Sequence, residues 1–252
     1  MDWHTLTQEI DSLCKTQQGS IHIALKEQKS FFYSDATMPL NAHHMMKLPV
    51  VMYIMKQIEL QKQQLTDSIP LSTTTKGAGV LAHLHNLSEM SLHDLMKLSM
   101  IVTDDTAANT LLEQIDFDDF DTFLKATNVS NTRLLKPFMS NNRMRDNFTS
   151  ALDCMHLLQL IGEANPFFNE ESRRHLYGML YDQQLPSPLT LANKEGRHFA
   201  HLSSTHYSIT ATAGILSLGQ RRLYVAIFSN TDDQETFWKP FSALIDSYVD
   251  HA

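Results

Sequence analysis

Hydrophobic and polar positions alternate near the start of the chain. Ile21, Ile23 and Leu25 are separated by less apolar residues, and after a polar break the aromatic run 31–33 follows. Alternation with a period of two is typical of a β-strand, and a short polar break between two such runs is typical of a hairpin turn. The pattern predicts a β-hairpin, and a helix over residues 2–15 before it.

Helical spacing dominates the middle of the chain. Apolar residues recur three and four positions apart at Leu48, Val51, Ile54, Met55 and Ile58. This spacing, with few polar interruptions, predicts a largely buried helix from about residue 44 to 63. Similar spacing predicts further helices over residues 92–100, 107–115, 118–126 and 149–161.

Strand patterns return in the last quarter. They predict strands over residues 189–193, 207–218 and 223–229, and a closing helix over 235–249. With two strands early, helices between and three strands late, the two ends of the chain must meet in one antiparallel sheet. The predicted fold class is α+β.

We expect one domain over residues 1–252. Within it, residues 1–40 and 185–252 form an α/β lobe, and residues 41–184 form an all-helical lobe. The low content of glycine and proline, 8 residues of each, agrees with a mainly helical middle because turn residues are few.

Composition and charge restrict the class of protein. The chain is 42% hydrophobic and 19% charged, which is too apolar for disorder. Its formal net charge is −8 and no long basic run occurs, which argues against a nucleic-acid or anionic-membrane partner. Two cysteines give no disulfide framework, and the first residues lack the pattern of a signal peptide, so we expect a cytoplasmic location.

The common short motifs of catalysis and cofactor binding are absent from the sequence. It contains no G-x-S-x-G, G-x-x-x-x-G-K-[ST], G-x-G-x-x-G, C-x-x-C or H-E-x-x-H. His83 and His85 do not have the spacing of a metal-ligand pair, so we expect them at the surface or in packing. No cofactor is expected.

Six short blocks occur in an order and spacing that span nearly the whole chain. They are 44–49 (HMMKLP), 76–81 (KGAGVL), 101–109 (IVTDDTAAN), 147–149 (NFT), 192–196 (ANKEG) and 213–216 (AGIL). Together they resemble the class A β-lactamase and penicillin-recognising serine hydrolase family. The resemblance implies a five-stranded antiparallel sheet with terminal helices, an all-helical lobe, and an active site between them.

The resemblance also implies which residues form the site. The family uses a nucleophilic serine in S-x-x-K, a serine and asparagine in S-D-N, and a K-[TS]-G strand that binds the substrate carboxylate. Here His44 and Lys47 stand at the first motif, Thr103 and Asp105 at the ends of the second, and Lys194-Glu195-Gly196 at the third. The backbone N–H groups of His44 and Arg197 would form the oxyanion hole.

These substitutions predict that serine acyl transfer is lost or severely impaired. Imidazole replaces the hydroxyl and reaches into the space of the scissile carbonyl. An acid at Asp105 is expected to raise the pKa of Lys47, which is unfavourable for a general base, and Glu195 would repel a substrate carboxylate. The segment 135–147 contains no glutamate to activate a deacylating water.

Three functions remain open on this basis. The first is a cleft that binds a small ligand, β-lactam-like or peptidoglycan-like, or a partner, without chemistry. The second is a hydrolase in which His44, with Asp105 and Lys47, acts as base or nucleophile. The third is a divalent-metal site from His44, Asp105 and Glu195, which the nearby lysines would oppose.

Overall fold

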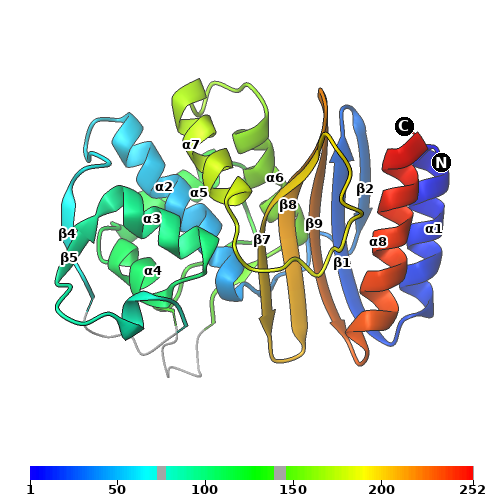
Figure 1. Ribbon diagram of the computed structural model, residues 1–252, viewed down its shortest axis with the longest axis horizontal. Coiled ribbons are helices and arrows are strands. Elements are labelled where there is room, and N and C mark those ends of the chain that lie inside the picture. The colour runs from blue at the N-terminus through cyan, green and yellow to red at the C-terminus, as the bar shows by residue number, and fades with distance from the viewer. Residues whose placement is uncertain (73–77, 139–145, 252) are drawn as a thin grey trace.

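A five-stranded antiparallel sheet joins the two ends of the chain, as the sequence predicts (Figure 1). The structure is a computed structural model that describes residues 1–72, 78–138 and 146–251. The strand order is β2-β1-β9-β8-β7. The strands are β1 (Gly19–Glu27), β2 (Ser30–Ser34), β7 (Arg197–His206), β8 (Ile209–Leu218) and β9 (Arg221–Thr231). The N-terminal hairpin therefore pairs with β9, the last strand.

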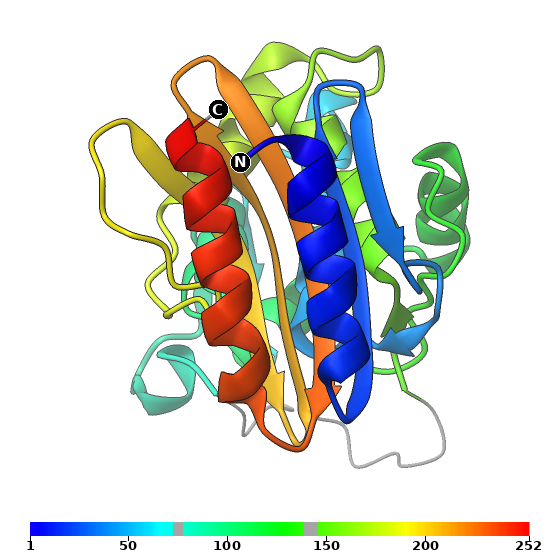
Figure 2. The ribbon, with the colours of Figure 1, turned by 90° about the vertical axis from the view of Figure 1, so that its right-hand side faces the viewer.

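Two terminal helices lie side by side on one face of the sheet (Figure 2). They are α1 (Trp3–Thr16) and α8 (Gln234–His251). Leu6 of α1 and Phe241 of α8 are fully buried with Ile23 and Ile227 of the sheet. Burial of such side chains, at roughly 1.5–3 kcal/mol each, holds the helices on the strands.

The other face of the sheet is covered by a helical region. Its longer elements are α2 (Lys47–Glu59), α3 (Leu92–Ile101), α4 (Asp105–Leu112), α5 (Phe117–Ala126), α6 (Ala151–Gly162) and α7 (Glu170–Tyr181). Its short elements are β3 (Leu40–Asn41), η1 (His43–Met46), β4 (Ser68–Pro70), η2 (Leu81–His83), β5 (Glu89–Ser91) and β6 (Phe148–Thr149). Helix α6 contacts β1, β8 and β9.

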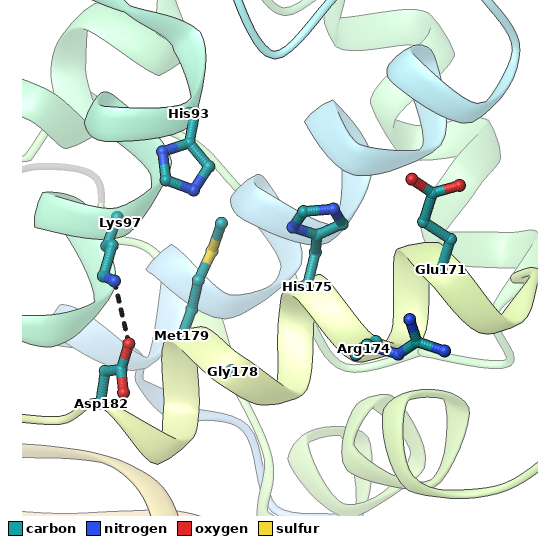
Figure 3. Close-up of a pocket in the computed structure, with 8 residues that line it drawn as sticks. All are labelled: His93, Lys97, Glu171, Arg174, His175, Gly178, Met179 and Asp182. Carbon is teal, nitrogen blue, oxygen red and sulfur yellow. Dashed lines mark ion pairs between the residues drawn. The ribbon is translucent and has the colours of Figure 1, made fainter.

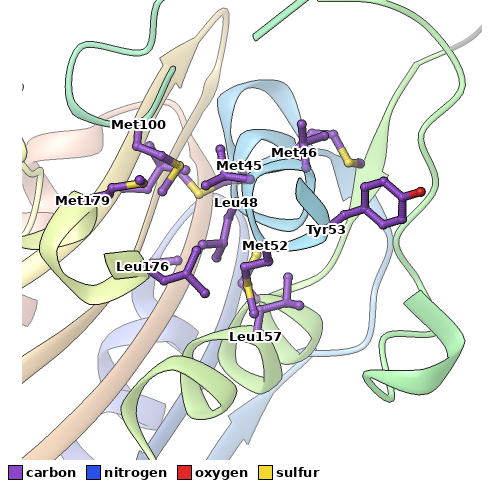
Figure 4. Close-up of a cluster of buried hydrophobic side chains, with 14 of the residues drawn as sticks. Met45, Met46, Leu48, Met52, Tyr53, Met100, Leu157, Leu176 and Met179 are labelled. Carbon is purple, nitrogen blue, oxygen red and sulfur yellow. The ribbon is translucent and has the colours of Figure 1, made fainter. Parts of the chain in front are cut away.

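Helix α2 runs through the centre of this region. Its residues 47–55 are all buried, and Figure 4 shows Leu48 and Met52 packed among side chains of α6 and α7. A helix that is apolar on all sides is expected where every face is covered by protein. Lys47 is the exception in this buried stretch, and its charge must therefore be balanced inside the protein.

Two sequence predictions are corrected here. Residues 189–193 are not a strand, because the backbone N–H groups of Thr190 and Ala192 donate to Ser242 and Asp246 side chains of α8 rather than to a neighbouring strand. The strand lies later, at β7, whose small polar residues hide its alternation. Helix α7 was not predicted, because its sequence is largely polar and only one side is buried.

Within the described ranges, no helix is long and apolar enough to cross a membrane.

Candidate active site

A cleft of about 400 Å³ lies where η1, the turn before α4 and the edge strand β7 meet. The residues that line it are His44, Thr103, Leu185, Pro186, Ser187, Pro188, Ser203, Ser204 and Thr205. Strand β7 contacts η1 directly. The fold therefore brings the first and second predicted motifs, at 44–47 and 103–105, to one cleft.

Lys47 forms a buried ion pair beneath this cleft. Its side chain is 0% exposed, and its Nζ lies 2.8 Å from Oδ1 of Asp105. Nζ also donates to the backbone carbonyl of Thr103. The second carboxylate oxygen, Oδ2 of Asp105, accepts from the backbone N–H of Ala78 at 2.9 Å. The ammonium and the carboxylate are thus both held by specific partners, as buried charges require.

The pKa of Lys47 differs from the sequence prediction. Burial lowers this pKa below its ordinary value of 10.5, and the charge and hydrogen bond of Asp105 oppose that shift. The predicted contribution of Asp105 has the expected sign, but desolvation outweighs it, so the prediction of a raised pKa is wrong. The lysine lies deep enough for the loss of water to dominate.

His44 lines the cleft above this ion pair. Its Nε2 is 3.9 Å from Oδ1 of Asp105, which is too far for a hydrogen bond. Burial lowers the pKa of His44 to about 3; the charge of Lys47 acts in the same direction and Asp105 opposes both. The imidazole is therefore neutral at pH 7.

Two residues beside the cleft have a strained backbone. Thr103 has a φ of 51° and His43 has a φ of 40°, in the left-handed region that residues other than glycine rarely adopt. For a β-branched residue such as Thr103 this conformation is a true outlier, and such strain is often found at functional sites. The carbonyl hydrogen bond to Lys47 helps hold Thr103 in place.

Asp104 and Asn109 have structural roles. Asp104 caps α4 by accepting from the N–H of Ala107 at 2.9 Å and also accepts from Leu81 at 2.8 Å. Asn109 exchanges two hydrogen bonds with the backbone of Phe138. These contacts fix the turn that carries Thr103 and Asp105.

Replacing Gly79 with alanine is expected to loosen this turn. Gly79 has a φ of +123°, and an added Cβ would lie 2.6 Å from the Cα of Asp104 and closer still to its carboxylate. Both the backbone conformation and the contact exclude a side chain, so we expect a loss of about 1–3 kcal/mol of stability, measured by urea unfolding. Gly178→Ala is the control, because its added Cβ meets nothing within 4 Å; equal losses in the two variants would contradict the steric argument.

The third predicted motif is not in this cleft. Lys194, Glu195 and Gly196 precede β7, and Arg197 begins it. Lys194 pairs with Asp250 of α8 at 2.5 Å, and Arg197 pairs with Asp250 too. Ser203 is six positions after Arg197 on the strand, which is about 20 Å at roughly 3.3 Å per residue.

Several predicted roles are corrected by this separation. Neither Lys194 nor Glu195 faces a ligand beside His44, and the backbone N–H of Arg197 cannot share an oxyanion hole with that of His44. The three proposed metal ligands, His44, Asp105 and Glu195, do not converge. Among the described residues, no group of three or more His, Cys, Asp or Glu is placed to hold a metal ion.

The residues that β7 contributes were missed by the sequence reasoning. Ser203, Ser204 and Thr205 lie near the end of the strand and line the cleft. The strand expected at 189–193 placed the third motif at 194–196, a segment that ends just before β7. The serines, threonine and histidines of 197–206 hide any period-two alternation, so no clear signal for these residues is present in the sequence. Lys76, Gly77 and most of the segment 135–147 in the predicted blocks lie outside the described residues.

A second hollow, of about 450 Å³, lies between α3 and α7 (Figure 3). Three of the four Asp, Glu, Lys and Arg side chains that line it are paired: Lys97 contacts Asp182 at 2.9 Å, and Arg174 contacts Glu170 at 3.0 Å. It shares no lining residue with the His44 cleft. We therefore place the candidate active site at His44.

Comparison with solved structures shows the fold. A beta-lactamase from Sphaerobacter thermophilus is similar over 100% of this chain and 98% of its own, at 20% identity and a TM-score of 0.88. PBP-A is similar over 99% and 97%, at 16% identity and a TM-score of 0.88. A beta lactamase from Xanthomonas campestris is similar over 98% and 97%, at 16% identity and a TM-score of 0.82.

No curated protein sequence matches the chain. The profile described as the beta-lactamase enzyme family matches residues 5–245, which is almost the entire chain. The sheet, the terminal helices, the helical region and this match agree, and the chain belongs to the beta-lactamase enzyme family.

Proposed function

We propose that this protein has lost serine acyl-transfer activity and retains the cleft as a binding site. The observation that carries the proposal is that the positions of the family's S-x-x-K motif hold His44 and a buried Lys47, whose ammonium is ion-paired with Asp105. His44 takes the place of the nucleophilic serine. The roles proposed below for Thr103, Lys47 and Asp105 follow from this assignment.

The nucleophile is absent at the required position. His44 lines the cleft with an imidazole in place of the attacking hydroxyl, and removing the serine of a comparable enzyme lowers turnover on the order of a millionfold. Thr103 is the nearest hydroxyl residue of the second motif, but it is 2% exposed and its strained backbone is tied to Lys47. Neither residue provides an activated hydroxyl.

The proton acceptor is also unavailable. A general base needs a free lone pair, and the Asp105 carboxylate 2.8 Å from the Nζ of Lys47 favours the protonated ammonium, which has none. Asparagine at position 105 would place a neutral group there, whereas aspartate holds the ammonium. The acid at position 105 therefore impairs acyl transfer in addition to the loss of the serine at position 44.

The alternative of a histidine-dependent hydrolase has less support. A pKa of about 3 makes His44 a weak base at neutral pH, where efficient general bases have pKa values near the working pH. The 3.9 Å gap to Asp105 leaves the ring without the oriented carboxylate partner of a catalytic couple. A metal-dependent reaction has less support as well, because Glu195 does not lie with His44 and Asp105 and one of the three expected metal ligands is therefore missing.

Binding can persist without chemistry because cleft shape and backbone donors survive the replacement of side chains. Structures of relatives contain small ligands. A point mutant of PBP-A, 17% identical to this chain, was solved as an acyl-enzyme complex with penicillin G. A variant of an ancestral class A beta-lactamase was solved with a transition-state analogue, 5(6)-nitrobenzotriazole. We extend only the binding of a small ligand to this protein.

Incubation with benzylpenicillin and a chromogenic cephalosporin tests the loss of acyl transfer. We expect no mass increase on the intact protein and no hydrolysis above the protein-free rate, because His44 occupies the serine position of S-x-x-K and Lys47 is paired with Asp105. A class A β-lactamase under the same conditions provides the positive control. A stable adduct of benzylpenicillin, or turnover that survives further purification, would refute the proposal.

A further inference from the structure

The described lining of the His44 cleft carries no charged side chain. Its polar residues are hydroxyl-bearing, apart from His44, and none of the described lining residues is Asp, Glu, Lys or Arg. With a pKa of about 3, His44 is itself neutral at pH 7. A carboxylate that entered would lose water without gaining a counter-charge from these residues.

The cations that the sequence led us to expect as attractors of an anionic ligand are already paired with carboxylates. Lys47 is fully buried and paired with Asp105 at 2.8 Å. Lys194 and Arg197, expected to attract an anion, are paired with Asp250 at the other end of β7. In the part of the chain that the structure describes, these lysine and arginine side chains are committed to carboxylates.

One buried hydroxyl of the cleft has no hydrogen-bond partner among the residues that the structure describes. Ser204 is 6% exposed, and its Oγ makes no hydrogen bond among the described residues. The neighbouring Ser203 differs, because its Oγ contacts Nδ1 of His201 at 3.0 Å and Oγ1 of Thr212 at 2.8 Å. Buried polar atoms are almost always paired, so an unpaired one that lines a cleft indicates a group supplied by a ligand.

The remaining wall of the cleft is apolar. Leu185, Pro186 and Pro188 come from the segment between α7 and β7, on the same cleft as Ser204. Apolar walls with a few placed polar groups are typical of sites that orient a small molecule, and here none of the described polar groups is charged. The chemistry of the lining therefore restricts the charge of its ligand as well as its size.

We propose that the cleft binds an uncharged ligand that carries an amide or ester group, whose carbonyl accepts a hydrogen bond from Ser204, and that it rejects the corresponding carboxylate. This inference rests on the proposed function, since it concerns binding at the same cleft. It predicts the opposite charge preference from that of a site built to attract an anionic substrate.

Two ligand pairs that differ only in charge test it. Benzylpenicillin is compared with its methyl ester, and N-acetyl-D-alanyl-D-alanine with its C-terminal amide, by isothermal titration calorimetry on the full chain. We expect the neutral member of at least one pair to bind about tenfold more tightly than the acid, because the acid gains no charge partner in a desolvated site. Equal or tighter binding of the acids, or no saturable binding of either neutral compound, would overturn the inference.

Two variants assign the effect to the cleft. Ser204→Ala should weaken the neutral ligand about fivefold to tenfold, because a hydrogen bond is lost, while the melting temperature stays the same or rises since an unpaired hydroxyl is removed. Thr205→Lys places a cation at an exposed position of the lining and should shift the preference towards the acid. An unchanged affinity in Ser204→Ala would exclude that hydroxyl as the contact.

The two proposals fail in different ways. An acyl adduct detected by intact mass would refute the loss of chemistry and leave the charge preference to be judged by calorimetry. A preference for the acids without any adduct would refute the uncharged ligand alone. Each result thus bears on one proposal.

Discussion

Asp105→Asn is expected to destabilise the protein by about 3–5 kcal/mol, because Lys47 would then be a buried cation without a counter-charge. The carboxylate also accepts from the backbone N–H of Ala78, and an amide can replace that contact only through its single oxygen. Chemical denaturation followed by circular dichroism measures the loss. This is among the largest effects expected of one substitution, since the pair is fully enclosed.

The pH dependence of this variant identifies the cause. Burial lowers the pKa of Lys47 and Asp105 opposes that shift, so removing the carboxylate lowers the folded-state pKa further. Between this pKa and the unfolded value near 10.5, the unfolded chain binds more protons than the folded one, so stability rises with pH. The difference in unfolding free energy between Asp105→Asn and the wild type should therefore become smaller from pH 7 towards pH 10.

A double variant provides the control for the ion pair. Lys47→Met alone leaves a buried carboxylate and should cost a similar amount, while Lys47→Met with Asp105→Asn should cost less than the sum of the two single losses. Additive losses, or a deficit that does not change with pH, would mean that the two side chains do not depend on each other.

Restoring a serine at position 44 is expected to restore little acylation by itself. In His44→Ser the hydroxyl returns, but the Asp105 carboxylate still favours the protonated form of Lys47, which has no lone pair to take the serine proton. Adding Asp105→Asn releases the lysine, and we expect acylation by benzylpenicillin to increase on the order of a hundredfold, the usual contribution of a positioned base. Intact mass spectrometry over time measures both rates.

Stability must be controlled in this comparison because the second substitution weakens the fold. Rates are normalised to the folded fraction at low temperature. His44→Ala and His44→Ala with Asp105→Asn lack the hydroxyl and should show no adduct. Rapid acylation of the single His44→Ser variant would disprove the argument that the ion pair blocks the base.

Much of the fold could be predicted from periodicity. The buried helix at 47–59 and the N-terminal hairpin follow from apolar residues at fixed spacing, because burial of one face or all faces constrains which positions are apolar. Helix α7 and strand β7 could not be predicted in the same way. Helix α7 buries only one side, and β7 carries serines and histidines where an apolar strand was expected.

Part of the candidate site could likewise be predicted from the sequence, and part could not. The sequence itself determined the family resemblance, the presence of His44 one helical turn before Lys47, and the acid at position 105, because local spacing on a helix and in a turn places these groups without long-range information. Only the tertiary structure decided that Lys47 loses more from burial than it gains from Asp105. It also decided that Lys194 and Arg197 are paired with α8, and that Ser204 completes the cleft. Desolvation and strand register depend on segments far apart in the chain, and neither can be derived from neighbouring residues.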